Sequence, residues 1–313
     1  MLRFVVTYKD KTEVKIEKVL TIAMDCELGV PADSLTLTCP YSRTLSENAD
    51  CISAYLENEL VFTGQIDDII NIKKSDGVIT KITARSLASG LLDNETEPVT
   101  YNNPASEFIF NRLLKPFGIH SFDADDIPFY GSLKIDKGMT VWQAFYNFCK
   151  NRYGAEPRIS GDGKAYFRGY KSEKKIVFGE NGDNINYYMV KENKFRCKVI
   201  SEVKLKLNEF GTYSGSIKNT NPDCKNIQRV RYVNATADRS TIQTADKIIS
   251  QSNSDSYSIL LDCNGCHLNL IGHSAVLDDS VLGRIENLVV NKVRYTLDSN
   301  GEKTSVTLGK EWF

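Results

Sequence analysis

The sequence lacks the marks of an exported or membrane-spanning protein. Its first ten residues include Arg3, Lys9 and Asp10 and no apolar core of about 7 to 15 residues, so they do not form a signal peptide. The longest uninterrupted apolar run covers only residues 187–190, whereas a spanning helix needs about 18 apolar residues. We therefore expect a chain that stays in the cytoplasm or leaves it without a signal, and that has no membrane partner.

An excess of charge of one sign is also missing. Lysine and arginine together number 39 against 40 aspartates and glutamates, which gives a net charge of −1. Such a chain has no basic field for holding nucleic acid, so no specific nucleic-acid recognition is expected. Glycine and proline are scarce, at 20 and 8 residues, which excludes collagen-like and low-complexity classes. A length of 313 residues predicts two or three domains of about 100 to 200 residues each.

Cysteine is too dilute for a disulfide scaffold, with 8 residues in the whole chain. Residues 263–267, Cys-Asn-Gly-Cys-His, have the spacing of a covalent haem attachment site. Haem attachment requires export, and a zinc site requires four ligands, for which His273 is the one other nearby candidate. We interpret Asn264-Gly265 as a hairpin turn between strands at 257–261 and 268–271. The sequence therefore predicts no metal and no cofactor.

Catalytic motifs are absent as well. The 3 histidines stand in no recognised hydrolase or metalloprotease motif. Asp67-Asp68 and Asp278-Asp279 are adjacent carboxylates, and adjacent residues on a strand point to opposite faces, so neither pair can flank one substrate bond. The acidic run at 123–126 lacks the spacing of a calcium loop. We expect no catalytic residues and a protein that binds rather than reacts.

Alternation of apolar and polar residues dominates the first part of the chain. It is clear at 34–39 and again at 52–56, and such alternation indicates half-buried strands. Two hairpin turns follow, one at 57–59 and one at Ser75-Asp76-Gly77, where glycine supplies the positive φ that a tight turn demands. We expect residues 1–92 to form a small antiparallel β-barrel.

Helix signals appear in residues 93–170. Asn103 predicts an N-cap for a helix over 104–118 with proline at its first position. Thr140 opens a capping box for a second helix, which Gly154 ends. We expect this part to be a mixed α/β module. The side chains of the second helix that we expect in its core include Trp142, Phe145 and Phe148.

Strand patterns return over residues 171–313, and we expect a second β-barrel there. A short helix at 241–250, with Ser240 and Gln243 as its cap, interrupts them.

One turn recurs 224 residues along the chain, from Ser75, Asp76 and Gly77 to Ser299, Asn300 and Gly301. Either the two β regions are a duplication, or hairpins have converged on the same turn chemistry. Under duplication the two turns occupy equivalent places in two barrels.

Several segments resemble the baseplate hub proteins of contractile phage tails and phage-tail-like bacteriocins, of the Gram-positive prophage type. The segments are 84–88, 91–98, 104–118, 138–142, 245–248 and 279–283. The resemblance implies a mainly β fold with an α+β insertion, in which two tail-tube-like antiparallel β-barrels accompany a small mixed α/β module. It also implies a homotrimer, in which two barrels per chain make a pseudo-sixfold ring.

The function implied by the resemblance is that of a structural hub, which joins the three-fold central spike to the six-fold tail tube and helps nucleate tube assembly. Its partners are then other copies of itself, the spike protein, the tube or tube-initiator protein, and tape-measure and wedge or LysM-type adaptor proteins. Such a hub is made in the bacterial cytoplasm and assembled into the baseplate of the particle. Two alternatives stay open: a non-enzymatic cell-surface or polysaccharide-binding β module, and a glycan hydrolase.

Overall fold

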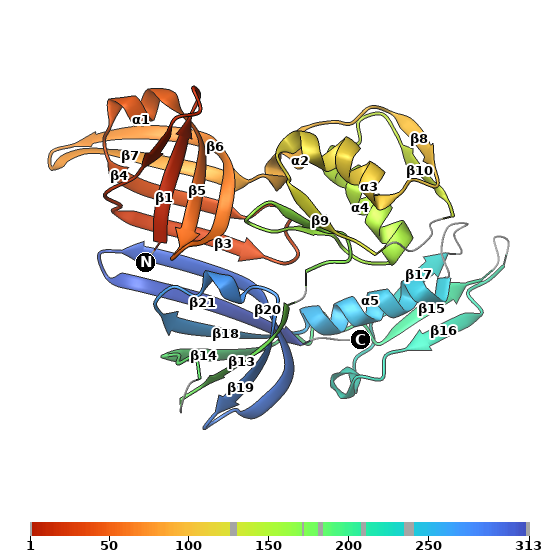
Figure 1. The fold of residues 1–313 in the computed structure, drawn as a ribbon. Coiled ribbons are helices and arrows are strands. Elements are labelled where there is room, and N and C mark those ends of the chain that lie inside the picture. Colours follow the sequence, from red (N-terminus) through yellow and green to blue (C-terminus); the bar gives the residue numbers. More distant parts are fainter. Residues whose placement is uncertain are drawn as a thin grey trace. The chain divides into compact units, whose positions relative to one another are not determined.

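The structure, a computed structural model, describes residues 2–125, 130–170, 172–180, 184–207, 211–234 and 241–310. It confirms the predicted fold class, which is mainly β with two antiparallel β-barrels and a small mixed α/β module (Figure 1). The chain divides into two compact units. Unit 1 holds Met1–Ser172, Asn264–Gly272 and Lys292–Thr304, and unit 2 holds Glu173–Cys263, His273–Asn291 and Ser305–Phe313.

The first barrel lies in unit 1, and its own strands have the order β3-β4-β7-β6-β5-β1-β2. Leu35, Leu37 and Cys39 of β4 are buried, whereas the residues between them are partly exposed, so one face of the strand packs into the core. The elements are β1 (Leu2–Tyr8), β2 (Glu13–Lys15), β3 (Thr21–Glu27), β4 (Ser34–Pro40), α1 (Arg43–Asn48), β5 (Ala49–Leu56), β6 (Glu59–Lys74) and β7 (Gly77–Ser86).

Both hairpins expected in this barrel are confirmed. Glu57, at φ 56°, lies in the turn between β5 and β6, and Ser75 and Asp76 form the turn between β6 and β7. Gly64 of β6 is required by close packing, because a Cβ atom there would lie 2.1 Å from the carbonyl oxygen of Arg85 on β7.

The mixed α/β module also lies in unit 1. Its core contains the rings of Phe145, Phe148 and Phe167, all fully buried, and the centroids of Phe145 and Phe167 are 4.9 Å apart. Trp142 packs against this core but is only partly buried. The elements are α2 (Ala88–Asp93), β8 (Val99–Asn102), α3 (Ser106–Ile109), η1 (Phe110–Leu114), η2 (Lys115–Phe117), β9 (Ser121–Asp123), β10 (Ser132–Ile135), α4 (Val141–Tyr153), β11 (Arg158–Ile159) and β12 (Lys164–Tyr166).

The predicted capping box of α4 is confirmed. The backbone N–H of Gln143 donates to Thr140 Oγ1 at 3.1 Å, and the N–H of Thr140 donates to Gln143 Oε1 at 2.9 Å. Gly154 ends the helix at φ 66°. Two of the four N–H groups that a helix start leaves unpaired are thus satisfied locally, which explains why this helix could be located from sequence.

The helix expected over 104–118 differs in two ways. It is a succession of α3, the π-turn η1 and the 3₁₀ turn η2, and it ends at Gly118 with φ 82°. Its N-cap is Ala105, so the assignment of Asn103 as the cap was wrong. The Oδ1 of Asn103 instead accepts a hydrogen bond of 2.8 Å from the N–H of Gly131.

The second barrel has the strand order β14-β18-β21-β20, and β19 pairs with both β20 and β13. Most of these strands belong to unit 2, and β20 and β21 each continue into unit 1. The elements are β13 (Ser172–Gly179), β14 (Met189–Lys194), β18 (Tyr257–Asn264), η4 (Leu268–Leu270), β19 (His273–Asp279), β20 (Gly283–Asp298) and β21 (Gly301–Lys310).

The prediction of a hairpin at Asn264-Gly265 was wrong. The segment 268–271 is no strand: Leu268 and Leu270 lie in η4, where both are buried. The next strand, β19, pairs with β13 and β20 instead of β18. Two buried leucines two positions apart have the period of a strand, and here they anchor a loop to the core instead. Position 265 still favours glycine, because its φ is 83°.

The chain forms a separate three-stranded sheet in unit 2 after it leaves β14 and before it enters β18. β15 (Glu202–Lys206) pairs antiparallel with β16 (Gly215–Lys218) and parallel with β17 (Val230–Asn234). Helix α5 (Thr241–Asp255) packs on this sheet and is longer than the helix expected there. A 3₁₀ turn, η3 (Pro222–Cys224), precedes β17. Ser240 and the side chain of Gln243, the expected cap, lie outside what the structure describes.

In the described part of the chain, no helix combines the length and the apolar character that crossing a membrane requires.

Candidate functional site

The two hairpins with similar turns, Ser-Asp-Gly and Ser-Asn-Gly, also have strands of the same length. β6 has 16 residues and β7 has 10, and β20 and β21 have 16 and 10 as well. Ser75 and Asp76 separate the first pair, and Ser299 and Asn300 separate the second. Gly77 and Gly301 begin the returning strands at φ 148° and φ 107°, so both turns use a backbone that favours glycine.

Strand order is the same around both hairpins. In the first barrel β6 lies between β7 and β5, β7 continues to β4 and β3, and β5 continues to β1. In the second, β20 lies between β21 and β19, β21 continues to β18 and β14, and β19 continues to β13. If β2 is left out and the six strands of each barrel are numbered in the order in which they occur in the chain, both barrels have the same strand order, 2-3-6-5-4-1.

Buried positions match at the same spacing. Thr80 and Thr304, each the fourth residue of its strand, are both 0% exposed. On the neighbouring strand, Cys39 of β4 and Cys263 of β18 are both buried. Each of these pairs is separated by 224 residues, which is also the separation of the two turns.

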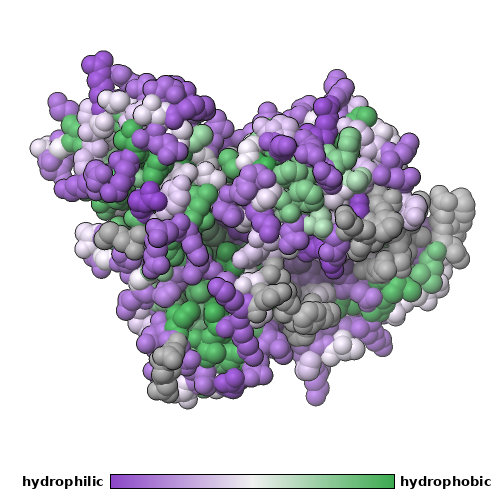
Figure 2. All heavy atoms as spheres, in the orientation of Figure 1, coloured by the Kyte–Doolittle hydropathy of each residue, from purple (hydrophilic) through white to green (hydrophobic). Residues whose placement is uncertain are grey.

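Apolar side chains reach the surface on the first hairpin. Ile70 of β6 is 47% exposed and Val78 of β7 is 39% exposed. Figure 2 shows one face of the molecule, on which most residues are hydrophilic and the apolar residues form separate groups. Single exposed apolar side chains are normal on protein surfaces, so Ile70 and Val78 alone do not define an interface.

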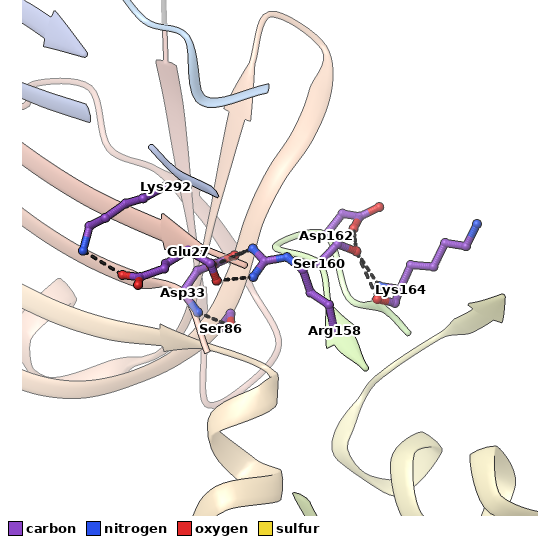
Figure 3. Close-up of polar contacts among 8 residues, drawn as sticks. All are labelled: Glu27, Asp33, Ser86, Arg158, Ser160, Asp162, Lys164 and Lys292. Carbon is purple, nitrogen blue, oxygen red and sulfur yellow. Dashed lines mark hydrogen bonds and ion pairs between the residues drawn. The ribbon is translucent and has the colours of Figure 1, made fainter. Parts of the chain in front are cut away.

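A buried ion pair joins the first barrel to the mixed module within unit 1. The Arg158 guanidinium extends from β11 toward Asp33 in the loop between β3 and β4 (Figure 3). Its Nη2 lies 2.9 Å from Oδ1 and 3.1 Å from Oδ2, and both residues are nearly inaccessible, at 3% and 2% exposed. Nη1 also donates to the carbonyl oxygen of Glu27 at 2.5 Å.

The surroundings of this pair tighten the junction further. Burial raises the pKa of the Asp33 carboxyl above its ordinary value, and the Arg158 guanidinium opposes that shift. The backbone N–H of Thr63 donates to the carbonyl oxygen of Gly161 at 2.7 Å. A Cβ atom at Gly161 would lie 2.2 Å from the carbonyl oxygen of Val61, so only glycine fits there. Sequence reasoning missed this junction, because its members are far apart in the chain.

The carboxylates considered as catalytic candidates make structural contacts. Asp67 forms an ion pair with Arg85 at 2.9 Å, and Asp68 accepts a hydrogen bond from Thr83 Oγ1 at 3.1 Å. Asp279 accepts a hydrogen bond of 2.5 Å from the Tyr187 hydroxyl, which lowers the pKa of that carboxyl. Asp126, at the end of the acidic run, lies outside the described residues.

The Cys-Asn-Gly-Cys-His segment forms no ligand set. Cys263 is fully buried in β18, and burial raises the pKa of its thiol to about 11. Burial also raises the pKa of Cys266. The Nε2 of His267 lies 3.0 Å from the carbonyl oxygen of Asn264. Across the residues that the structure describes, no group of three or more His, Cys, Asp or Glu side chains could hold a metal ion.

Comparison with known proteins gives matches among solved structures. No family model matches the chain. No curated protein matches it either. The 43 kDa tail protein of prophage MuSo2 from Shewanella oneidensis is similar over 99% of both chains, with a TM-score of 0.81 at 14% identity. A tail protein from Neisseria meningitidis is similar over 99% of this chain and 96% of its own, with a TM-score of 0.78 at 18% identity.

A more distant match is the c3393 protein of E. coli, a type VI secretion component with structural similarity to the bacteriophage T4 tail proteins gp27 and gp5. It covers 95% of this chain and 74% of its own, with a TM-score of 0.58 at 8% identity. At these identities the likeness concerns the fold. The two barrels and the module therefore have the fold of phage tail proteins and are tail-tube-like.

Proposed function

We propose that this chain is the structural baseplate hub of a contractile tail particle, joining a three-fold central spike to a six-fold tail tube and helping to nucleate the tube. The observation that carries the proposal is the match in strand order and strand length around the hairpins β6–β7 and β20–β21. Two equivalent barrels per chain let three chains present six similar surfaces, which is what a junction between three-fold and six-fold symmetry needs.

Equivalence of the two barrels is part of the proposal. In it, Ser75, Asp76 and Gly77 correspond to Ser299, Asn300 and Gly301. The mixed module, over about residues 93–170, has no counterpart in this correspondence. The matched burial of Thr80 and Thr304 supports the same alignment, because two unrelated hairpins have no reason to bury a threonine at the same position.

The partners follow from the hub role. They are two further copies of the chain, the spike protein and the tube or tube-initiator protein, with tape-measure and wedge or LysM-type adaptor proteins around them. The particle type, that of a Gram-positive prophage or a bacteriocin, rests on the sequence resemblance. The chain itself carries no enzymatic step in this proposal, and the contacts of Asp67, Asp68 and Asp279 support that, because each carboxylate is engaged in holding the barrels.

The test is the stoichiometry of the complex with the spike. The chain and a spike protein from a neighbouring reading frame, where one is found, are co-expressed, and the mass of the purified complex is measured by multi-angle light scattering. We expect three copies of this chain on one spike trimer. A complex with one copy, or no complex, would argue for the alternative of an independent cell-surface or polysaccharide-binding module.

A further inference from the structure

The long strand β20 changes partners along its length. Residues 283–289 pair with β19, and residues 292–297 pair with β3. Two ion pairs support the second contact: Lys292 Nζ lies 2.8 Å from Glu27 Oε2, and Arg294 Nη1 lies 3.6 Å from Asp25 Oδ1. Along the final part of β20, β3 therefore pairs with the edge that β19 covers further back in the strand.

Strand β6 has a contact that corresponds to the pairing of β20 with β19, but none, among the described residues, that corresponds to the pairing of β20 with β3. Residues 59–65 pair with β5, at the positions 224 residues before the β19 contact of β20. Residues 68–73, which correspond to 292–297, pair with β7 alone among the described residues. Their other edge has backbone N–H and C=O groups without a strand partner.

Exposure follows the same difference. Val293 and Tyr295 are 0% and 1% exposed where β3 covers β20. The corresponding residues of β6 are less protected, since Ile69 is partly exposed and Asn71 is exposed. This segment of β6, with three isoleucines among its six residues, is thus less covered than its counterpart in β20.

The complementary edge is β14. It stands at the end of its strand order and pairs with β18 alone among the described residues, whereas β3, its counterpart in the first barrel, pairs with β4 and with β20. The counterparts are fixed by register: Ile22 pairs with Leu37, and Val190 pairs with Leu261, 224 residues beyond Leu37. Ile22 is buried and Val190 is partly exposed.

We propose that residues 68–73 of β6 bind β14 of a second copy of this chain as an antiparallel strand. The register of the contact between β20 and β3, transferred to these strands, pairs Ile70 with Asn193 and Ile72 with Lys191 of the second copy. Such a contact joins different surfaces of the two copies, so its repetition closes a ring or continues as a filament. The proposal rests on the hub function proposed above in one respect, which is that three copies close the ring.

Disulfide trapping tests the register directly. Ile70→Cys and Asn193→Cys are combined in one chain that also carries Cys197→Ser, because Cys197 is the exposed native thiol nearest to β14. Opposite residues on antiparallel strands have Cα atoms about 4.5 to 5.5 Å apart, within the range that a disulfide spans. After mild oxidation of the assembled chain, we expect most of the protein to run at three times the chain mass on a denaturing gel and to return to one chain mass with reductant.

Three matched variants control the experiment. Arg294→Cys with Asp25→Cys places the same pair of cysteines at the corresponding contact inside one chain, and it should form a disulfide without a change in mass. Val78→Cys with Asn193→Cys moves one thiol from the edge to the exposed face of β7 and should not cross-link. Ile72→Cys with Lys191→Cys repeats the test one pair along the strand, in case the first pair prevents folding.

The outcomes separate this inference from the hub function. Reducible trimers with either edge pair support the contact. Light scattering that shows three copies, while neither edge pair cross-links and the pair inside one chain does, overturns the strand contact and leaves the hub function standing. A chain that stays monomeric with its spike protein present, and does not cross-link, overturns both.

Discussion

Arg158 and Asp33 form a buried ion pair in which one guanidinium nitrogen, Nη2, lies 2.9 and 3.1 Å from the two carboxylate oxygens, and neither side chain is more than 3% exposed. The pair joins β11 of the mixed module to the loop between β3 and β4 of the first barrel. Removing one partner of such a pair leaves the other charge buried without compensation. The hold of the module on the barrel therefore depends on both residues together.

Arg158→Ala is expected to lower the free energy of unfolding by about 3 to 5 kcal/mol, because the Asp33 carboxylate stays buried without its cation. Urea unfolding followed by tryptophan fluorescence measures the change. The control is Arg43→Ala, which breaks an exposed ion pair with Glu47 within α1 and should cost about 0.5 kcal/mol or less. Equal losses in the two variants would mean that the buried pair adds nothing beyond a surface contact.

Phe145→Ala should destabilise the module by about 3 to 5 kcal/mol, because the ring is fully buried and its removal leaves a cavity. Trp142→Ala should cost less, about 1 to 2 kcal/mol, because the indole is only partly buried and water replaces part of it. Trp142, Phe145 and Phe148 were expected from sequence to face the core of the module, and Trp142 does pack against that core, but it is only partly buried. Thermal melts of the two variants give the ranking, and a larger loss for Trp142 would contradict it.

Gly77→Ala and Gly301→Ala should each destabilise by about 1 to 2 kcal/mol, because both residues have positive φ. No atom lies within 4 Å of a Cβ built at either position, so the cost is conformational and not a clash. Gly29→Ala is the matched control, since its Cβ would also be unobstructed and its φ lies outside the positive range. Similar losses at the two turns are expected for equivalent hairpins, and a loss at one alone would speak against equivalence.

Thiol labelling should distinguish the cysteines by burial. Cys197 is exposed and should react first, whereas Cys263 is buried and its pKa is raised to about 11. At pH 8 about one Cys263 thiol in a thousand is ionised, and this fraction rises tenfold with each pH unit until the pKa is reached. Mass spectrometry of the native protein after short exposure to a maleimide at pH 7, 8 and 9 follows both sites. Rapid labelling of Cys263 at pH 7 would show that its burial is wrong.

Local signals in the sequence accounted for the elements that are stabilised locally. The turn at Ser75-Asp76-Gly77 and the capping box at Thr140 were found because the residues that form them are within four positions of each other. The helix over 104–118 was found, but its cap was misassigned. The side chain of Asn103 accepts a hydrogen bond from Gly131, which is 28 residues away in the sequence, and a local pattern cannot predict such a contact.

Contacts across the chain were out of reach of the same reasoning. Arg158 and Asp33 are separated by 125 residues, and neither stands in a motif. The sheet of β15, β16 and β17 was merged with the second barrel, because its short strands have the same alternation as barrel strands. The two buried leucines of η4 were taken for a strand for a similar reason: a period of two does not distinguish a strand from an anchored loop.

Strand β3 depends on a part of the chain that is synthesised very late. Glu27 of β3 and Lys292 of β20 are 265 residues apart. At about 5 to 20 residues per second, a ribosome takes roughly 13 to 53 seconds to add them. Throughout that interval β3 of the nascent first barrel can pair with β4 along one edge, whereas the strand that covers its other edge, β20, has not yet been made. The edge of β3 is therefore open to pairing with other chains during that interval, and the rate of translation sets how long it stays open.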